Sequence, residues 1–143
     1  MPLANGGILI DDSYNANPGS VAAAIESLVL ACALDKKISV LVLGDMAELG
    51  ESAENLHAQI GALSKSRGIQ KLYACGKFSQ ATCSSFGDGA MHFNNQPELT
   101  DALKKLLGPQ HRVLIKGSRS SQMDQVVSAI HNAFGLKENS NAS

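Results

Sequence analysis

The sequence predicts a three-layer α/β domain in which a mostly parallel sheet has helices on both faces. Short runs rich in Val, Ile and Leu, typical of buried strands, alternate with stretches whose apolar residues recur at three- and four-residue steps, typical of amphipathic helices. Such alternation along the whole chain favours parallel βαβ units. No repeat or linker divides the chain, so we expect one domain over residues 1–135 and a disordered, Asn- and Ser-rich tail over 136–143.

The elements follow from these patterns in order. Strands are expected at 8–10, 38–43, 72–75, 91–93 and 113–115. Helices are expected around 21–32, 53–63, 78–84, 99–106 and 123–134, and the third of these has the weakest pattern. Asn17 as N-cap and Pro18 at the first helical position start the first helix, and Ser52 is a candidate cap for the second.

Residues 3–8 contain an Asn-Gly pair between apolar residues, which is a strong hairpin signal. We therefore expect a strand that begins before Leu3 and pairs with the strand at 8–10. This would suit a domain excised from a longer protein, with Met1 and Pro2 as a cloning start.

The composition argues against several classes of protein. The 143 residues are 44% hydrophobic with a formal net charge of -1, so neither nucleic acid nor a lipid surface is an expected partner. We find no signal peptide and no apolar run that approaches the roughly 20 residues needed to span a bilayer. We therefore expect a cytoplasmic monomer. The odd number of cysteines, Cys32, Cys75 and Cys83, without metal-type spacing indicates reduced thiols.

Polar motifs follow three of the expected strands. Residues 11–20 combine acids, amides and Tyr14, whose ring could stack on a base or sugar; residues 44–52 form an acidic loop; and residues 116–121 combine two cations and three hydroxyls with a helix start. Because parallel strands end at one edge of the sheet, these loops are expected to form one ligand site there. The last loop suits a carboxylate or phosphate. Taken singly, each motif could also be an ordinary turn or a solvated surface.

Other signatures are missing from the sequence. It has neither a G-x-x-x-x-G-K-[ST] phosphate loop nor a G-x-G-x-x-G fingerprint, so an autonomous nucleotide site is not expected. The four histidines, His57, His92, His111 and His131, are scattered, and no metal site is predicted. His57 lies near the acidic loop, where a supporting role is open but a helix-surface or hydrogen-bonded histidine is the favoured interpretation.

Together the motifs at 11–18, 43–50 and 116–120 resemble the C-terminal domain of the Mur ligases. They read DDSYNANP, LGDMAELG and KGSRS, and their order and separations also agree with that family over about residues 3–134. The resemblance implies a Rossmann-like fold with a six-stranded sheet. In it, an antiparallel edge strand before Asn5 would pair with 8–11, and the strands ending at Asp12, Leu43 and Lys116 would meet at one edge.

The resemblance also implies an activity for the full-length protein. It would be an ATP-dependent, amide-forming ligase of three domains that adds D-alanyl-D-alanine to UDP-MurNAc-tripeptide through an acyl phosphate, in peptidoglycan precursor synthesis. The phosphate loop, the Mg²⁺ ligands and the UDP-MurNAc-tripeptide site would lie on the other domains. This chain alone is therefore expected to be inactive, and none of its residues is expected to be catalytic by itself.

By the same resemblance, one set of residues faces ATP. Asp12 matches the acid that contacts the ATP ribose. The residues expected to line the same nucleotide-facing turn are Tyr14, Asn15 and Asn17.

A second set faces the dipeptide. Asp45 matches an acid near the incoming amine, where a carboxylate can hold an ammonium group and help it lose a proton. Lys116, Ser118 and Arg119 match the loop near the dipeptide, and the planar guanidinium suits a terminal carboxylate.

Two alternatives stay open at this point. The chain could be a non-catalytic α/β module that binds a small anion through residues 116–121. It could also be the C-terminal domain of another Mur or folylpolyglutamate-type ligase. A phosphate-loop motif upstream of Met1 in the gene would favour a ligase over the binding module.

Overall fold

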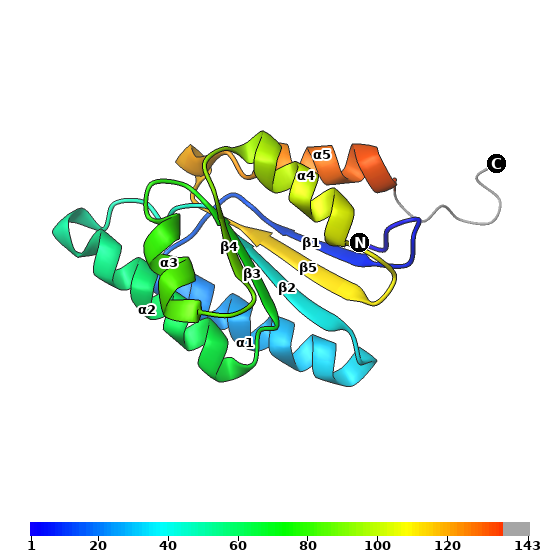
Figure 1. Ribbon diagram of the computed structural model, residues 1–143, viewed down its shortest axis with the longest axis horizontal. Helices are drawn as coiled ribbons and strands as arrows, with labels where there is room; N and C mark the ends of the chain where they lie inside the picture. Colours follow the sequence, from blue (N-terminus) through cyan, green and yellow to red (C-terminus); the bar gives the residue numbers. More distant parts are fainter. Residues whose placement is uncertain (136–143) are drawn as a thin grey trace.

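The computed structural model describes residues 1–135, and the α/β class predicted from the sequence is confirmed (Figure 1). Strands and helices alternate in the order β1 (Ile8–Asp12), α1 (Pro18–Asp35), β2 (Ile38–Leu43), α2 (Ala53–Arg67), β3 (Lys71–Cys75), α3 (Ser79–Phe86), β4 (Ala90–Phe93), α4 (Gln96–Leu106), β5 (His111–Lys116) and α5 (Asp124–Phe134). Short 3-10 turns cover Gly50–Ser52 and Arg119–Ser121. The tail expected at 136–143 lies outside the described residues.

The sheet is parallel, with strand order β1-β5-β2-β3-β4. Within residues 1–135 it has five strands, so the predicted sixth strand is wrong. The predicted antiparallel pairing is present only as an isolated bridge between Pro2 and Ile8, beside reciprocal hydrogen bonds of Met1 with Leu9 at 2.9 and 3.0 Å. The turn that begins at Leu3 leaves too few residues before it for a strand.

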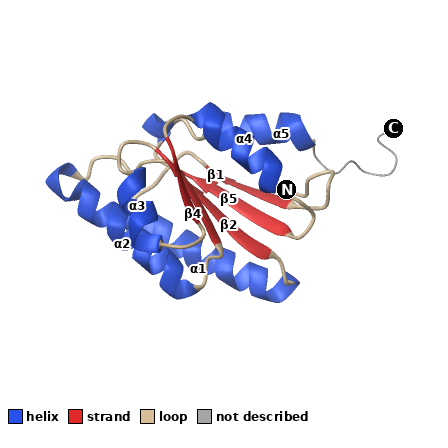
Figure 2. Cartoon of the chain, viewed as in Figure 1, coloured by secondary structure: helices blue, strands red, loops and turns tan. Residues whose placement is uncertain are grey.

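Helices α1, α2 and α3 cover one face of the sheet, and α4 and α5 cover the other (Figure 2). The core on the first face includes Val21, Ile25 and Leu28 of α1, which are fully buried. The core on the second face is built by α4 and α5 against residues of all five strands. Residues of one strand alternate between the two cores, as Leu41 and Val42 do, which explains why the strand runs are apolar throughout.

The cap predicted for α1 is present, whereas the cap predicted for α2 is not, although α2 begins at Ala53 as expected. The Asn17 side chain accepts from Ser20 N at 2.9 Å, Ser20 Oγ accepts from Asn17 N at 3.0 Å, and Pro18 opens the helix. Ser52 precedes α2, but its side chain makes no capping hydrogen bond. The predicted Ser52 cap is therefore wrong, because the 3-10 turn at Gly50–Ser52 leads directly into the helix.

By length and composition, α1 could cross a membrane, although we expected no such run from the sequence. One face of α1 is nevertheless packed against the sheet through Val21, Ile25 and Leu28. Length and apolar composition are therefore weak evidence here, because a core helix has the same features.

The cysteines are free thiols, as predicted. Cys32 and Cys75 are buried, and Cys83 is half-buried. Burial raises the pKa of Cys83 to about 11, so its reactive thiolate is scarce at neutral pH.

His111, at the start of β5, predicts a pH dependence of stability. Burial lowers the pKa of His111 below the ordinary 6.5, and its Nδ1 accepts the Gly108 N–H at 3.0 Å. Between the two pKa values the unfolded chain binds more protons. As the pH falls below the ordinary pKa of about 6.5, the free energy of unfolding should therefore decrease, by up to about 1.4 kcal/mol per pH unit. Urea unfolding of the wild type and of His111→Gln checks this, and equal pH slopes in the two proteins would contradict it.

Candidate functional site

The three polar motifs meet at the carboxyl edge of the sheet, as predicted. The parallel register places Asp12, the last residue of β1, beside Lys116, the last residue of β5. The same register places Lys116 beside Leu43, the last residue of β2. The loops that follow these three strands therefore leave the sheet next to one another.

Lys116, at the end of β5, joins the loop after β5 to the loop after β1. Its side chain is 3% exposed, and its Nζ donates to Asp12 Oδ2 and to the Asn15 carbonyl oxygen, both at 2.8 Å. A buried ammonium group is costly unless it is paired and hydrogen-bonded, so this contact fixes the turn after β1. The structure thus places Lys116 with the residues predicted to face ATP.

The turn between β1 and α1 is ordered by its own side chains. Asp11 Oδ1 accepts from Ser13 N at 3.1 Å and from Ser13 Oγ at 2.6 Å. Tyr14 is 68% exposed, as expected of a ring available for stacking. Asn15 and Asn17 are also exposed, but Asn17 Oδ1 is occupied by the capping bond of α1.

Asp45 joins the loop after β2 to the loop after β3. Its carboxylate accepts from Lys77 N at 2.8 Å and from Phe78 N at 3.2 Å, just before α3, while 25% of the side chain remains exposed. Gly76 has a φ of 141°, and a Cβ there would lie 2.5 Å from Asp45 Oδ1. Glycine at this position lets the backbone approach the carboxylate.

Ser118 is buried in the loop after β5, where it contacts the loop after β2. Its N–H donates to the Asp45 carbonyl oxygen at 3.0 Å, and its hydroxyl pairs with that of Ser120 at 3.1 Å. Arg119 is exposed, at the first position of the 3-10 turn Arg119–Ser121. The helix expected around 123–134 is present as α5, which begins at Asp124, and the 3-10 turn separates Arg119 from it.

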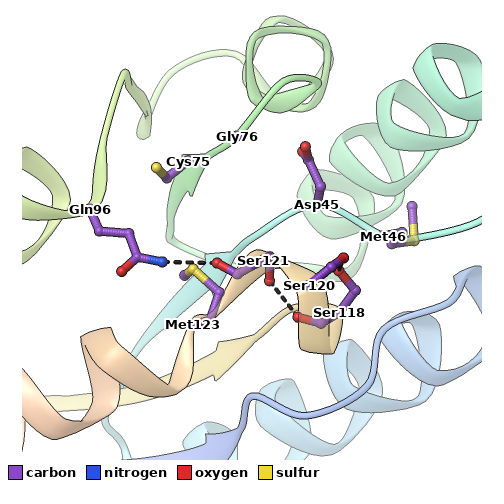
Figure 3. A pocket seen from close by; sticks show the side chains of 9 residues that line it. All are labelled: Asp45, Met46, Cys75, Gly76, Gln96, Ser118, Ser120, Ser121 and Met123. Atoms are coloured by element: carbon purple, nitrogen blue, oxygen red, sulfur yellow. Dashed lines mark hydrogen bonds between the residues drawn. The ribbon is translucent and has the colours of Figure 1, made fainter.

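Two adjoining cavities lie among these loops. The first, of about 260 Å³, is lined by Asp45, Met46, Cys75, Gly76, Gln96, Ser118, Ser120, Ser121 and Met123 (Figure 3). The second, of about 590 Å³, is lined by Tyr14, Asn15, Ala16, Asn17, Ala47, Glu48, Ser118, Arg119 and Ser120. Ser118 and Ser120 line both, so the cavities share a wall.

Asp12 and Lys116 instead line a third space, an open groove of about 580 Å³ between β1 and α1. Tyr14 and Asn15 line this groove as well as the second cavity. The structure thus brings all the predicted site residues to one edge, distributed over three spaces that share lining residues.

Gln96 is a cavity residue that sequence reasoning missed. Its Nε2 donates to the carbonyl oxygens of Ser121 at 2.9 Å and Gln122 at 3.0 Å, linking the start of α4 to the loop after β5 (Figure 3). Its place at the first position of α4, in the junction after β4, is a usable signal, because that junction opens at the same edge. Met46, Cys75 and Met123 also line this cavity and lack the polar chemistry that singled out the other residues.

Within residues 1–135 there is no group of three or more His, Cys, Asp or Glu side chains placed to hold a metal ion.

The family model described as "Mur ligase, glutamate ligase domain" matches residues 2–119. The chain is 43% identical over 132 residues to the UDP-N-acetylmuramoyl-tripeptide–D-alanyl-D-alanine ligase of Escherichia coli, a match that covers 91% of this chain and 28% of that protein. The ligase of the same name from Bacillus subtilis is 32% identical over 124 residues, covering 83% of this chain and 27% of that protein. The chain thus spans less than a third of the length of these relatives.

Solved structures point to the same family as these sequence matches. A crystal structure of MurF from Acinetobacter baumannii superposes with a TM-score of 0.79 and 29% identity, covering 89% of this chain and 28% of that one. MurF from Thermotoga maritima in complex with ADP gives a TM-score of 0.72 at 21% identity, covering 93% of this chain and 31% of that one, which is a likeness of fold.

The contact between Gly76 and Asp45 leads to a stability prediction. Gly76→Ala should destabilise the chain by about 2 kcal/mol or more, because it adds a clash with Asp45 to the strain of a positive φ. Gly68→Ala is the matched control: its φ is 99° with nothing near the added Cβ, so it should cost only about 1 kcal/mol. Urea unfolding measures both, and equal losses would show that Asp45 does not depend on Gly76.

Proposed function

The chain belongs to the Mur ligase family, as its glutamate ligase domain, and we propose that it serves a UDP-N-acetylmuramoyl-tripeptide–D-alanyl-D-alanine ligase by closing on ATP and the incoming dipeptide. The observation that carries this proposal is the junction of the three motif loops at one sheet edge, linked by Lys116 to Asp12 and by Ser118 to Asp45. The relatives named above support this ligase over another family member or an anion-binding module.

On the ATP side, we assign the ribose to Asp12. Lys116 holds Asp12 Oδ2, and 31% of the Asp12 side chain is exposed, which leaves Oδ1 to accept a hydroxyl hydrogen. The exposed ring of Tyr14 offers a stacking face, and Asn15 and Asn17 complete the polar turn. The buried ammonium group orients the carboxylate before the nucleotide arrives.

On the dipeptide side, we assign the terminal carboxylate to Arg119 and the amine to Asp45. The two side chains line adjoining cavities that share Ser118 and Ser120, so one extended ligand can reach both. The guanidinium group offers two parallel donors to a carboxylate. The exposed part of the Asp45 carboxylate can hold the ammonium group and help it lose the proton that must leave before the amine attacks the acyl phosphate.

We propose that the rest of the ligase supplies the phosphate loop, the Mg²⁺ ligands and the tripeptide site, because the chain matches one domain of the Mur ligase family and its sequence has no phosphate-loop motif. Mg²⁺ would neutralise phosphate charge during acyl phosphate formation. The enzyme is proposed to work as a monomer in the cytoplasm, where ATP is available, without nucleic acid or membrane insertion.

The ATP assignment predicts a selective kinetic defect. Asp12→Asn keeps an oxygen for Lys116 but loses the charge, so in the full-length ligase the KM for ATP should rise about tenfold, the equivalent of about 1.4 kcal/mol. Steady-state kinetics with ATP varied at saturating dipeptide measures this. Asp35→Asn is the control, because Asp35 pairs with Arg112 at the opposite end of the sheet. A KM for ATP that responds equally to both variants would argue against a ribose contact.

The assignment of the dipeptide carboxylate to Arg119 predicts that a positive charge at position 119 is not enough to bind the dipeptide. Arg119→Lys should raise the KM for D-alanyl-D-alanine about tenfold, because lysine keeps the charge but loses the planar two-point contact. Arg67→Lys, at another exposed arginine, should have no effect. The measurement varies the dipeptide at saturating ATP and tripeptide. If Arg119→Ala leaves both KM and turnover within about twofold, Arg119 is an ordinary surface charge.

A further inference from the structure

The peptide group between Asp45 and Met46 is held from both sides. Its carbonyl oxygen accepts the Ser118 N–H at 3.0 Å, and its N–H donates to His57 Nε2 at 3.0 Å. These two bonds fix the plane of the peptide, and with it the point from which the Asp45 side chain leaves the backbone. Figure 3 shows Asp45 and Met46 on one loop, opposite the turn that carries Ser118.

The other contacts of His57 define its protonation state. The ring is 4% exposed, and Nδ1 lies 2.7 Å from the Ala53 carbonyl oxygen. A carbonyl oxygen only accepts, so Nδ1 carries the hydrogen, and Nε2 is left with the lone pair that the Met46 N–H requires. The geometry therefore demands the neutral ring with its hydrogen on Nδ1.

His57 also supports the far end of the Asp45 side chain. Its ring packs on that of Phe78 with the centroids 4.8 Å apart, and the Phe78 N–H donates to Asp45 Oδ1 at 3.2 Å. His57 Nε2 is itself 3.8 Å from Asp45 Oδ1. Nε2 carries no hydrogen in this tautomer, so it makes no bond to the carboxylate. His57 supports Asp45 through the packing on Phe78 and, at the backbone, through Met46.

We propose that His57 is a positioning residue for the dipeptide side of the site: it holds the Asp45–Met46 peptide so that Asp45 and Ser118 face the same cavity. This inference rests on the function proposed above. His57 is not among the residues that line the cavities, so it acts through Asp45 and not by touching substrate.

Two substitutions in the full-length ligase separate this role from bulk packing. His57→Leu fills the volume but offers no acceptor, so kcat/KM for D-alanyl-D-alanine should fall about tenfold or more while the KM for ATP stays within about twofold. His57→Gln can place its amide oxygen near the position of Nε2 and accept the Met46 N–H. It should therefore restore kcat/KM to within about threefold of the wild type.

His111→Leu is the matched control. His111 is equally buried and its ring also accepts a backbone N–H, from Gly108, but it lies at the opposite edge of the sheet. This variant should lose thermal stability, as His57→Leu does, without a change in either KM. The inference is overturned if the two Leu variants have the same kinetics, or if folded His57→Gln is as impaired as His57→Leu.

A spectroscopic test on this chain alone keeps the inference separate from the proposed function. Two-dimensional ¹H–¹⁵N spectra of the histidine side chains should show His57 Nδ1 protonated and Nε2 unprotonated at neutral pH; the reverse pattern would overturn the inference whatever the reaction. A full-length wild-type protein that ligates no D-alanyl-D-alanine would instead defeat the proposed function, even with the expected spectrum.

Discussion

The buried ammonium group of Lys116 is the constraint on which the site depends. A lysine Nζ withdrawn from water at the end of a central strand must find a negative charge and further acceptors, and here it finds Asp12 and the Asn15 carbonyl oxygen. Both partners belong to the turn after β1, so that turn cannot move independently of β5. A turn of polar residues, which could otherwise adopt many conformations, is thereby fixed in one.

The loop after β2 is joined to the loop after β5 by a backbone hydrogen bond. The Asp45 carbonyl oxygen binds Ser118, two residues beyond Lys116, and its carboxylate binds the backbone before α3. A Cβ on Gly117 would lie 2.4 Å from Ser121 Oγ, and one on Gly44 would lie 2.7 Å from the same atom, so the turn after β5 packs against the ends of β2 and β5 because glycine follows both strands. The loops after β1, β2, β3 and β5 thus form one connected polar network at the sheet edge.

Most of the strands and helices, and the edge at which the site lies, could be predicted from the sequence, because they depend on local patterns of residues. Apolar runs such as 38–43 mark strands because both faces of a covered sheet are dry, and Asn17-Pro18 marks a helix start through its own chemistry. That the polar loops share an edge follows from parallel strands. The cap predicted at Ser52 is wrong because a 3-10 turn, which depends on the path of the chain, precedes α2.

The side-chain partners could not be predicted, because they depend on distant parts of the chain. Lys116 and Asp12 are 104 positions apart, and only the strand order places them side by side. The sequence favours a helix-surface or hydrogen-bonded His57, and the packing of α2 makes it the second of these, with partners in the Asp45 loop that the sequence does not identify. Gln96 carries no motif, and its part in the cavity depends on where the turn after β5 passes.

The central claim, that the Asp12–Lys116 pair fixes the turn after β1 to β5, is tested most directly by a double-mutant cycle. The free energies of unfolding of the wild type, Asp12→Ala, Lys116→Met and the double variant give the coupling between the two side chains, because each single variant removes the contact. For a buried, hydrogen-bonded pair we expect at least about 1.5 kcal/mol. A coupling below about 0.5 kcal/mol, as for an exposed ion pair, would contradict the account.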